Sequence, residues 1–228
     1  GYRVAPKGFL PALRGLCDKY GMLLVVDEVQ SGMGRTGKMF ASDHIGLKGD
    51  IVTVAKGIAS GLPLGAACAR AEAMSWPPGA HASTCGGTPV ECAAATTTIR
   101  LLKEQLVANA ALVGEHLMSG LRDLQKKHAL VGDVRGKGLM IGIELVRDRH
   151  TKERAVEERN ALVQAVFRRG VLILGAGKNA IRLAPPLVFT REQADSVLRV
   201  LDEALTEVVS GSEIVNSCGT PWVSGSES

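Results

Sequence analysis

Two short apolar runs, each followed by a charged residue, constrain this chain more than any other feature. Residues 22–26 read MLLVV and precede Asp27, and residues 51–55 read IVTVA and precede Lys56. Unbroken runs rich in β-branched residues are typical of strands that are buried on both faces of a parallel sheet. Ligands of open α/β sheets bind at the carboxyl ends of such strands. We therefore expect Asp27 and Lys56 to meet in one pocket.

The two charged side chains suit one kind of cofactor. A lysine amine can form a Schiff base with an aldehyde, and a carboxylate can keep a ring nitrogen protonated. Pyridoxal 5'-phosphate needs both groups from its protein. The pair Asp27 and Lys56 therefore predicts a pyridoxal-phosphate site.

Composition limits the other classes of function. The net charge of +4 is too small to indicate nucleic-acid binding, and no basic run or aromatic platform accompanies it. The five cysteines lack CxxC spacing, so no metal site is predicted, and they fit thiols in a reducing cytoplasm. No apolar run is long enough for a membrane span, and no signal peptide is visible. These features together predict a cytoplasmic protein.

The alternation of strands and helices predicts an α/β fold followed by a smaller α+β domain. The predicted elements, in chain order, are a helix at 8–20, strands at 22–26 and 51–55, a short helix at 38–45, a strand at 64–69, helices at 90–102 and 107–127, a strand pair at 131–145, a helix at 157–169, strands at 171–174 and 180–183, and a helix from the N-cap Thr190 to about Val209. We place the domain boundary near Gln105, which gives domains at 1–104 and 105–209. Residues 210–228, rich in Ser and Gly, predict a disordered tail.

The glycine-rich turn at 31–37 contains two motifs of nucleotide-binding proteins. Gly32, Gly34 and Gly37 spell GxGxxG, but no long helix and no suitably placed acid follow. The stretch GMGRTGKM is close to a P-loop, but Met39 stands where Ser or Thr must hold magnesium. Both motifs are isolated, so neither dinucleotide binding nor nucleotide hydrolysis is favoured.

Five motifs, read in order, resemble one family. They are VVDEVQSGMGRTGKMFA, DIVTVAKGIASGLPLGA, HASTCGGTPVECAAA, VGDVRGKGLMIGIELV and IRLAPPL. Together they look like class III (omega) aminotransferases, closest to 4-aminobutyrate aminotransferase, and the resemblance covers nearly all of residues 1–209. It implies pyridoxal phosphate bound on the aspartate-aminotransferase fold. The chain would be the C-terminal half of such an enzyme, with 1–104 as part of the large, mostly parallel cofactor-binding domain.

The resemblance also implies a role for each of five residues. Lys56 would hold the cofactor as a Schiff base and then act as the base that moves a proton. Asp27 would pair with the pyridinium nitrogen, and Gln30 would lie against the phenolic oxygen. Thr84 would reach the cofactor phosphate across the interface of a homodimer. Arg182 would grip a substrate carboxylate, which a planar guanidinium suits.

Four further positions near these residues need comment. Cys85 stands where an aromatic residue is common in the family, and Thr88 where asparagine is common, so the substrate pocket is left unassigned. Glu28 precedes the glycine-rich turn and Arg35 lies within it, and we predict that they form an ion pair that supports the turn.

The implied reaction moves an amino group from an omega-amino acid, such as 4-aminobutyrate, to a 2-keto acid, such as 2-oxoglutarate. Acetylornithine or ornithine aminotransfer, amino-acid racemisation and dialkylglycine decarboxylation are alternatives on the same fold. An alternative of another class is a non-catalytic fragment that folds only with a partner chain. We also expect exposed sheet edges and weak retention of pyridoxal phosphate if these residues are expressed alone.

Overall fold

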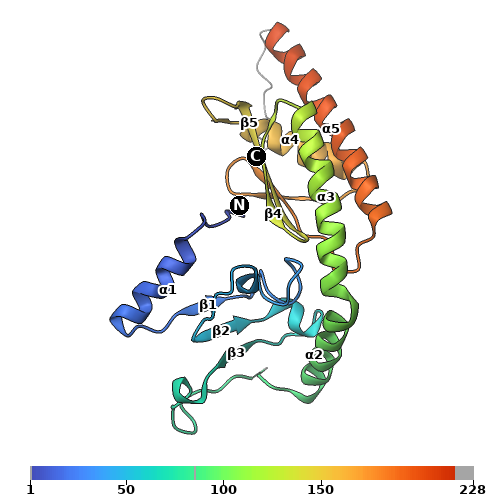
Figure 1. The fold of residues 1–228 in the computed structure, drawn as a ribbon. Coiled ribbons are helices and arrows are strands. Elements are labelled where there is room, and N and C mark those ends of the chain that lie inside the picture. The colour runs from blue at the N-terminus through green and yellow to red at the C-terminus, as the bar shows by residue number, and fades with distance from the viewer. Residues whose placement is uncertain (1, 85, 219–228) are drawn as a thin grey trace, which may run out of the picture.

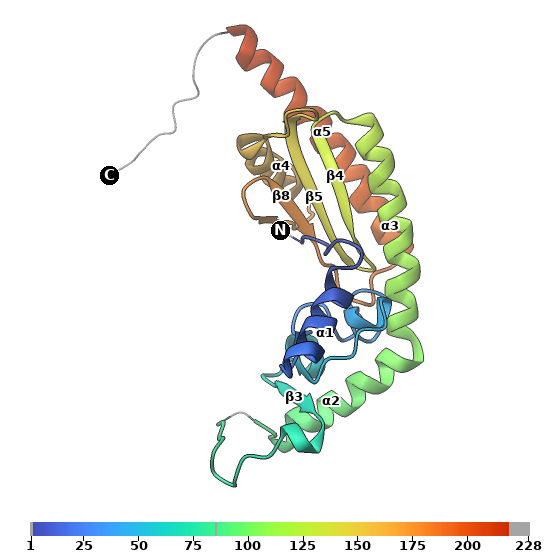
Figure 2. The ribbon, with the colours of Figure 1, turned by 60° about the vertical axis from the view of Figure 1, so that its left-hand side comes forward.

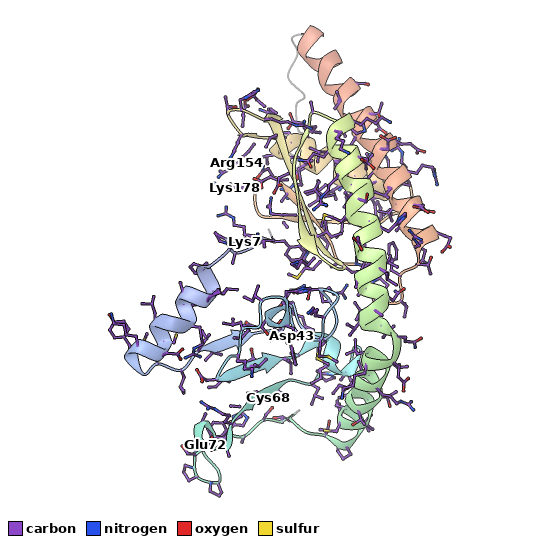
Figure 3. All side chains as sticks on the ribbon, viewed as in Figure 1. Lys7, Asp43, Cys68, Glu72, Arg154 and Lys178 are labelled. Carbon is purple, nitrogen blue, oxygen red and sulfur yellow. The ribbon has the colours of Figure 1, made fainter. Side chains whose placement is uncertain are left out.

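The structure, a computed structural model, describes residues 2–84 and 86–218. Two sheets occupy separate parts of the chain, and a long bent helix connects them (Figure 1). In Figure 3, Asp43 and Cys68 are labelled in the part of the chain that contains the first sheet, and Arg154 and Lys178 in the part that contains the second. The two groups of elements approach each other along the connecting helix.

The first sheet has the strand order β1-β2-β3. Helix α1 (Phe9–Tyr20) precedes β1 (Val25–Asp27), and β2 (Ile51–Val54) and β3 (Ala66–Ala69) follow. β1 and β2 are parallel and β2 and β3 are antiparallel. The predicted α/β arrangement of a strand, a crossover and a parallel strand is therefore present.

β1 begins at Val25, three residues later than the strand predicted at 22–26, and this apolar run is less buried than its composition predicts. The side chains of Met22, Leu23 and Val25 are about half exposed, at 50%, 57% and 54%. β1 lies at the edge of this sheet, and among the described residues only β2 pairs with it. The expected burial on both faces is therefore wrong for this strand, whereas the expected exposed sheet edge is confirmed.

The connecting helix changes its packing partners midway. It comprises α2 (Pro89–Leu101), a π-helical turn (Leu102–Leu106) and α3 (Val107–Lys127), which confirms the two predicted helices to within a residue. Leu102 packs with Met33 and the first sheet, whereas Ala110 belongs to the core of the second. The π-helical turn, a common site of helix distortion, lies where we predicted the domain boundary, and the division at 104/105 stays a prediction.

The second sheet has the order β4-β5-β8-β7, and all of these pairings are antiparallel. Its strands are β4 (Val131–Lys137), β5 (Met140–Asp148), β7 (Leu174–Ala176) and β8 (Ala180–Leu183), and the short β6 (Glu153–Arg154) pairs with β5. α3, α4 (Val156–Arg168) and α5 (Arg191–Cys218) pack on one face through the main hydrophobic core. Figure 2 shows α3 and α5 side by side on this face.

Two predicted short elements differ from the structure. Residues 38–45 form only a 3-10 turn at Ala41–His44, because the Asp43 carboxylate accepts the Phe40 N–H at 3.0 Å and the turn ends before Gly46. The strand predicted at 171–174 lies instead at Leu174–Ala176, where the register with β8 supplies its backbone partners.

The last helix begins as predicted but ends later. Thr190 Oγ1 accepts the Gln193 N–H at 3.3 Å and Gln193 Oε1 accepts the Thr190 N–H at 3.0 Å, a reciprocal cap that confirms the predicted N-cap. The predicted end near Val209 is wrong, since α5 continues to Cys218. Ser and Gly cost about 1 kcal/mol or less each in a helix that is already nucleated. The predicted disordered tail at 210–228 is thus helical as far as 218, and its residues 219–228 lie outside the described part.

Asp202 on α5 forms hydrogen bonds with residues at the C-terminal end of α3. Its Oδ2 accepts from Lys127 Nζ and its Oδ1 contacts His128 Nε2, both at 2.6 Å. The hydrogen bonds from Lys127 and His128 lower the pKa of Asp202. We expect D202N to reduce the free energy of unfolding by about 1 to 2 kcal/mol at neutral pH, as measured by chemical denaturation.

The effect of D202N should depend on pH with a definite sign. A carboxyl group whose folded pKa is depressed stabilises the protein fully above its unfolded pKa, about 3.9. That stabilisation is lost as the pH falls from about 4 through the lower folded pKa of Asp202, so the two proteins should converge in acid. D123N is the matched control, because Asp123 is 67% exposed and, among the residues that the structure describes, forms an ion pair with Lys126 alone. An equal loss in both variants would contradict the assignment.

Candidate active site

Lys56 and Gln30 are in direct contact at one edge of the first sheet. Lys56 begins a 3-10 turn (Lys56–Ala59) just after β2, and Gln30 lies in the turn that follows β1. Because β1 and β2 are parallel neighbours, both turns leave the sheet at the same edge. Lys56 Nζ donates a hydrogen bond to Gln30 Oε1 at 2.7 Å. The amine is thereby oriented by an amide although its side chain is exposed.

The backbone of Lys56 is strained. Its φ is 50°, in the left-handed region, and the preceding Ala55 is extended. A non-glycine residue in this region costs about 1–3 kcal/mol, and such residues cluster at functional sites. The buried Met33 has a φ of 53° and packs against Gly57, next to Lys56. The local structure thus holds the lysine in a conformation that an ordinary loop would avoid.

Asp27 ends β1, opposite Thr53 of β2. Its Oδ1 accepts the N–H of Val29 at 2.9 Å, which fixes the direction of the carboxylate. Its Oδ2 has no hydrogen-bond partner among the described residues, and the side chain is exposed. The carboxylate therefore keeps one oxygen available for a cation at the edge that also carries Lys56.

The geometry fits the groups that pyridoxal phosphate requires. An amine and an amide 2.7 Å apart follow two adjacent parallel strands, and the first of these strands ends at a carboxylate with an uncommitted oxygen. An aldehyde carbon, a phenolic oxygen and a pyridinium nitrogen would find one matching group each in Lys56, Gln30 and Asp27. A tyrosine that the sequence did not point to joins them, since Gln30 Nε2 donates to Tyr2 Oη at 3.3 Å.

Arg182 lies on the second sheet, apart from this cluster. It occupies β8, where it pairs with Gly142 of β5 and Leu174 of β7. Its guanidinium is half-buried and forms no hydrogen bond or ion pair with a described residue. Arg135 lies in the same row beyond Gly142 and is bound by Asp133 and Glu144 at 2.7 and 2.6 Å. Arg182 is therefore the arginine of this row that is available to an anion.

Thr84 also lies apart from Lys56. It is exposed in the segment before α2, and no hydrogen bond or ion pair joins it to Lys56, Gln30 or Asp27 within the described chain. Figure 2 shows this segment extending away from the sheets. The structure thus brings together Lys56, Gln30 and the strand end of Asp27, and leaves Thr84 and Arg182 separate. Of the two unusual positions nearby, Thr88 is the N-cap of α2, and Cys85 lies outside the described residues.

The predicted ion pair between Glu28 and Arg35 is wrong. Glu28, only 1% exposed, accepts from Ser31 Oγ at 2.5 Å and from the Ser42 N–H at 2.8 Å. Arg35 instead donates to the backbone carbonyl oxygens of Leu139 and Pro185, both of which belong to the second part of the chain. The chain reverses between Glu28 and Arg35, so the two side chains point to different neighbours. The serine three residues after Glu28 was a sequence signal for its true role as an anchor of the turn.

Other kinds of site are not found in the described part of the chain. Within residues 2–84 and 86–218, no group of three His, Cys, Asp or Glu side chains is arranged to hold a metal ion. None of the helices described there is long and apolar enough to cross a bilayer. A hollow of about 590 Å³ lies beside Arg14, Phe40 and Arg70, and neither Lys56 nor Asp27 lines it.

Comparison with known proteins gives consistent matches. The family model described as "Aminotransferase class-III" matches residues 1–205. Three similar proteins are a leucine/methionine racemase of Thermococcus litoralis (43% identical), an acetylornithine aminotransferase of Caldanaerobacter subterraneus (38%) and a 5-aminovalerate aminotransferase of Pseudomonas aeruginosa (38%). The matches cover 92%, 91% and 91% of this chain and 48%, 51% and 50% of those proteins. The chain thus spans about half the length of these relatives.

Two solved structures show the same fold. One is an (S)-enantioselective omega-transaminase from Thermomicrobium roseum, 39% identical, with a TM-score of 0.82 over 90% of this chain and 48% of that one. The other is an amine transaminase from an uncultivated Pseudomonas species in its pyridoxal-phosphate-bound form, 38% identical, with a TM-score of 0.83 over 90% and 49%. The expected α/β fold of pyridoxal-phosphate transaminases is therefore confirmed.

Proposed function

Because this chain belongs to the class III aminotransferase family, we propose that it forms the lysine-bearing part of an enzyme that moves amino groups with pyridoxal phosphate. The observation that carries the proposal is the 2.7 Å contact between Lys56 Nζ and Gln30 Oε1, with Asp27 at the end of the adjacent parallel strand. The left-handed backbone of Lys56 supports it, because strain of this kind is found at functional sites.

Each residue of the cluster has a distinct part in this proposal. When bound, pyridoxal phosphate supplies the electron sink that makes a proton on the substrate's amino-bearing carbon removable. Lys56 Nζ would be the covalent anchor, and after the substrate's amine has displaced it, the free lysine amine would take that proton and return it. The free oxygen of Asp27 keeps the ring nitrogen protonated. Gln30 orients the lysine amine and donates towards the phenolic oxygen.

We propose an omega-amino acid of the 4-aminobutyrate type as the amino donor and a 2-keto acid such as 2-oxoglutarate as the acceptor. Arg182 would hold the carboxylate at the far end of either substrate, and the lack of a carboxylate partner for its guanidinium supports this role. The relative that acts, by its name, on 5-aminovalerate supports a donor with a terminal amino group. Thr84, on a segment that extends away from its own sheet, would serve the phosphate of a second subunit in a homodimer.

Racemisation is a second candidate, because the relative named leucine/methionine racemase is 43% identical to this chain. Both reactions begin with removal of a proton by the same lysine, but only amino transfer consumes a keto acid. Incubation of the protein that carries this chain with one enantiomer of leucine or methionine, without any keto acid, separates them. Loss of optical activity under these conditions would replace amino transfer by racemisation.

Borohydride reduction followed by peptide mapping tests the proposed anchor. In the protein that carries this chain, loaded with pyridoxal phosphate, we expect the reduced label on the peptide that contains Lys56. Lys38, an exposed lysine of the same glycine-rich region, provides the internal control and should stay unmodified. Label spread over surface lysines, or an unlabelled Lys56 in a folded protein, would favour the non-catalytic alternative.

A further inference from the structure

Arg35 lies where the two sheets touch, in the glycine-rich turn that follows Gln30. Its Nη1 donates to the carbonyl oxygen of Leu139 at 3.4 Å and to that of Pro185. Its own carbonyl oxygen accepts the backbone N–H of Leu139 at 3.0 Å. In Figure 1 the turn between β4 and β5 points towards this region of the first sheet. A single residue of the first part is therefore bonded to two segments of the second.

The turn that carries Arg35 is tied by hydrogen bonds to the residues around Lys56. The Gly32 N–H donates to the carbonyl of Glu28 at 2.9 Å, and the Arg35 N–H donates to the carbonyl of Gly32 at 3.3 Å. The buried carboxylate of Glu28 anchors the same turn from the other side. Gln30 stands inside this span and accepts from Lys56. The positions of Arg35 and of the Lys56–Gln30 pair are therefore coupled.

At its other end, Arg35 is linked to the strand that carries Arg182. β8 ends at Leu183, and Pro185 follows two residues later. Proline fixes its own φ and restricts the residue before it, so this short connection has little freedom. A bond to the carbonyl of Pro185 thus restrains the end of β8 directly.

The charge of Arg35 is held without a carboxylate. Burial lowers the pKa of Arg35, whereas the hydrogen bond that Arg147 on the second sheet donates to Glu158 raises the pKa of Arg147. A guanidinium stays protonated in either setting, so Arg35 remains a cation, and within residues 2–84 and 86–218 its guanidinium is bound by carbonyl oxygens and by no carboxylate. Apolar residues of similar volume fill such a position at no electrostatic cost. An arginine at this position is therefore explained by the directional hydrogen bonds of its guanidinium and not by its volume.

We propose that Arg35 is a positioning residue that sets the span between Arg182 and the Lys56–Gln30 pair, and thereby selects the length of substrate that reaches both. The inference rests on the function proposed above. Arg35 itself contacts neither substrate nor cofactor in this proposal. The substrates concerned are omega-amino acids, in which a chain of defined length separates the carboxylate from the reacting amino group.

A double-mutant cycle in the protein that carries this chain tests whether Arg35 acts through Arg182. R35M is expected to raise KM for the preferred donor, among 4-aminobutyrate and 5-aminovalerate, by about tenfold or more while changing kcat less, because small displacements of binding groups have large effects. R182M alone removes the carboxylate contact. If Arg35 acts through Arg182, then R35M/R182M should be no weaker than R182M. Additive losses of the two substitutions would overturn the proposal.

Hydrogen exchange provides a readout that needs neither turnover nor cofactor. In R35M we expect the backbone amide of Leu139 to exchange about tenfold faster, because its acceptor is the carbonyl of a residue that has lost its side-chain anchors. R70M is the matched control, since Arg70 is 76% exposed and its one side-chain partner in the described part of the chain is Asp50, which belongs to the same sheet region. Exchange at Leu139 and a KM that match those of R70M would overturn the proposal.

R35K keeps the protein testable if R35M does not fold. A lysine keeps the charge, but it carries its donors on a flexible stem instead of the rigid, planar guanidinium whose Nη1 donates to both carbonyls. It should therefore show the same increase in KM and in Leu139 exchange to a smaller extent, and wild-type values in both would count against the assignment. An unlabelled Lys56 in the borohydride experiment would defeat the proposed function alone, since Leu139 exchange still reports whether Arg35 restrains the contact.

Discussion

Replacement of Lys56 by alanine is expected to abolish amino transfer and to leave pyridoxal phosphate bound without a covalent link. The rate should fall by about 10³- to 10⁴-fold or more, because a general base that is also the covalent anchor is removed. The fold should be unaffected, since Lys56 is exposed and the lost hydrogen bond to Gln30 is at the surface. Removal of a left-handed lysine should not cost stability beyond that bond. Steady-state kinetics and the visible absorption of the protein that carries this chain provide the measurements.

The control for K56A is K38A. Lys38 is an exposed lysine in the glycine-rich region, and the enzyme should keep its activity when Lys38 is replaced by alanine. A large excess of methylamine supplies a free amine of the right chemistry, so partial recovery of K56A with this amine would show that the missing group is a base. An active K56A, or an inactive K38A, would contradict the assignment of Lys56.

The strand ends explain why the cluster around Lys56 was predictable. Each run of β-branched residues defines where a strand stops, and parallel pairing brings two such ends to the same edge. The resemblance then added Gln30, which the structure places 2.7 Å from Lys56. Local patterns of this kind also predicted most helices, the N-cap at Thr190 among them.

Contacts between segments that are distant in the sequence could not be predicted from local sequence patterns. The acceptor of Arg35 at Pro185 lies 150 positions away, and no periodicity encodes such a partner. Glu28 and Arg35 looked like an ion pair because they are near each other in sequence, yet the reversal of the chain sends them to different neighbours. Likewise, the burial of residues 22–26 depends on what covers β1, which their own composition does not specify.

Backbone packing at the contact between the two sheets was equally hidden in the sequence. A Cβ on Gly114 of α3 would lie 2.3 Å from the carbonyl carbon of Gly138, and one on Gly138 would lie 2.4 Å from the carbonyl carbon of Thr36. A Cβ on Gly37 would meet the Cα of Ala111 at 2.9 Å. At these glycines the three segments therefore pack so closely that an added Cβ would overlap with neighbouring backbone atoms.

We expect G114A to reduce the free energy of unfolding by about 3 kcal/mol, at the upper end of overpacking effects, because backbone atoms must move. Two glycines at ordinary helical φ provide matched controls. The three atoms nearest to a Cβ on Gly120 all belong to the Leu198 side chain, and a Cβ on Gly15 would meet nothing within 4 Å. Alanine favours helix over glycine by up to about 1 kcal/mol, so G15A should stabilise slightly and G120A should fall between the two. Chemical denaturation of the three variants measures the order.

The close packing of Gly114 affects the candidate active site as well as the stability of the fold. Gly138 precedes Leu139, the partner of Arg35, and Thr36 follows Arg35 in the glycine-rich turn. If α3 is pushed away from Gly138, the turn between β4 and β5 must shift against the segment that carries Gln30. G114A should therefore speed exchange of the Leu139 amide as R35M does, whereas G120A should not, although Gly120 lies on the same helix. A G114A protein as stable as G15A, with wild-type exchange at Leu139, would show that the two sheets are joined elsewhere.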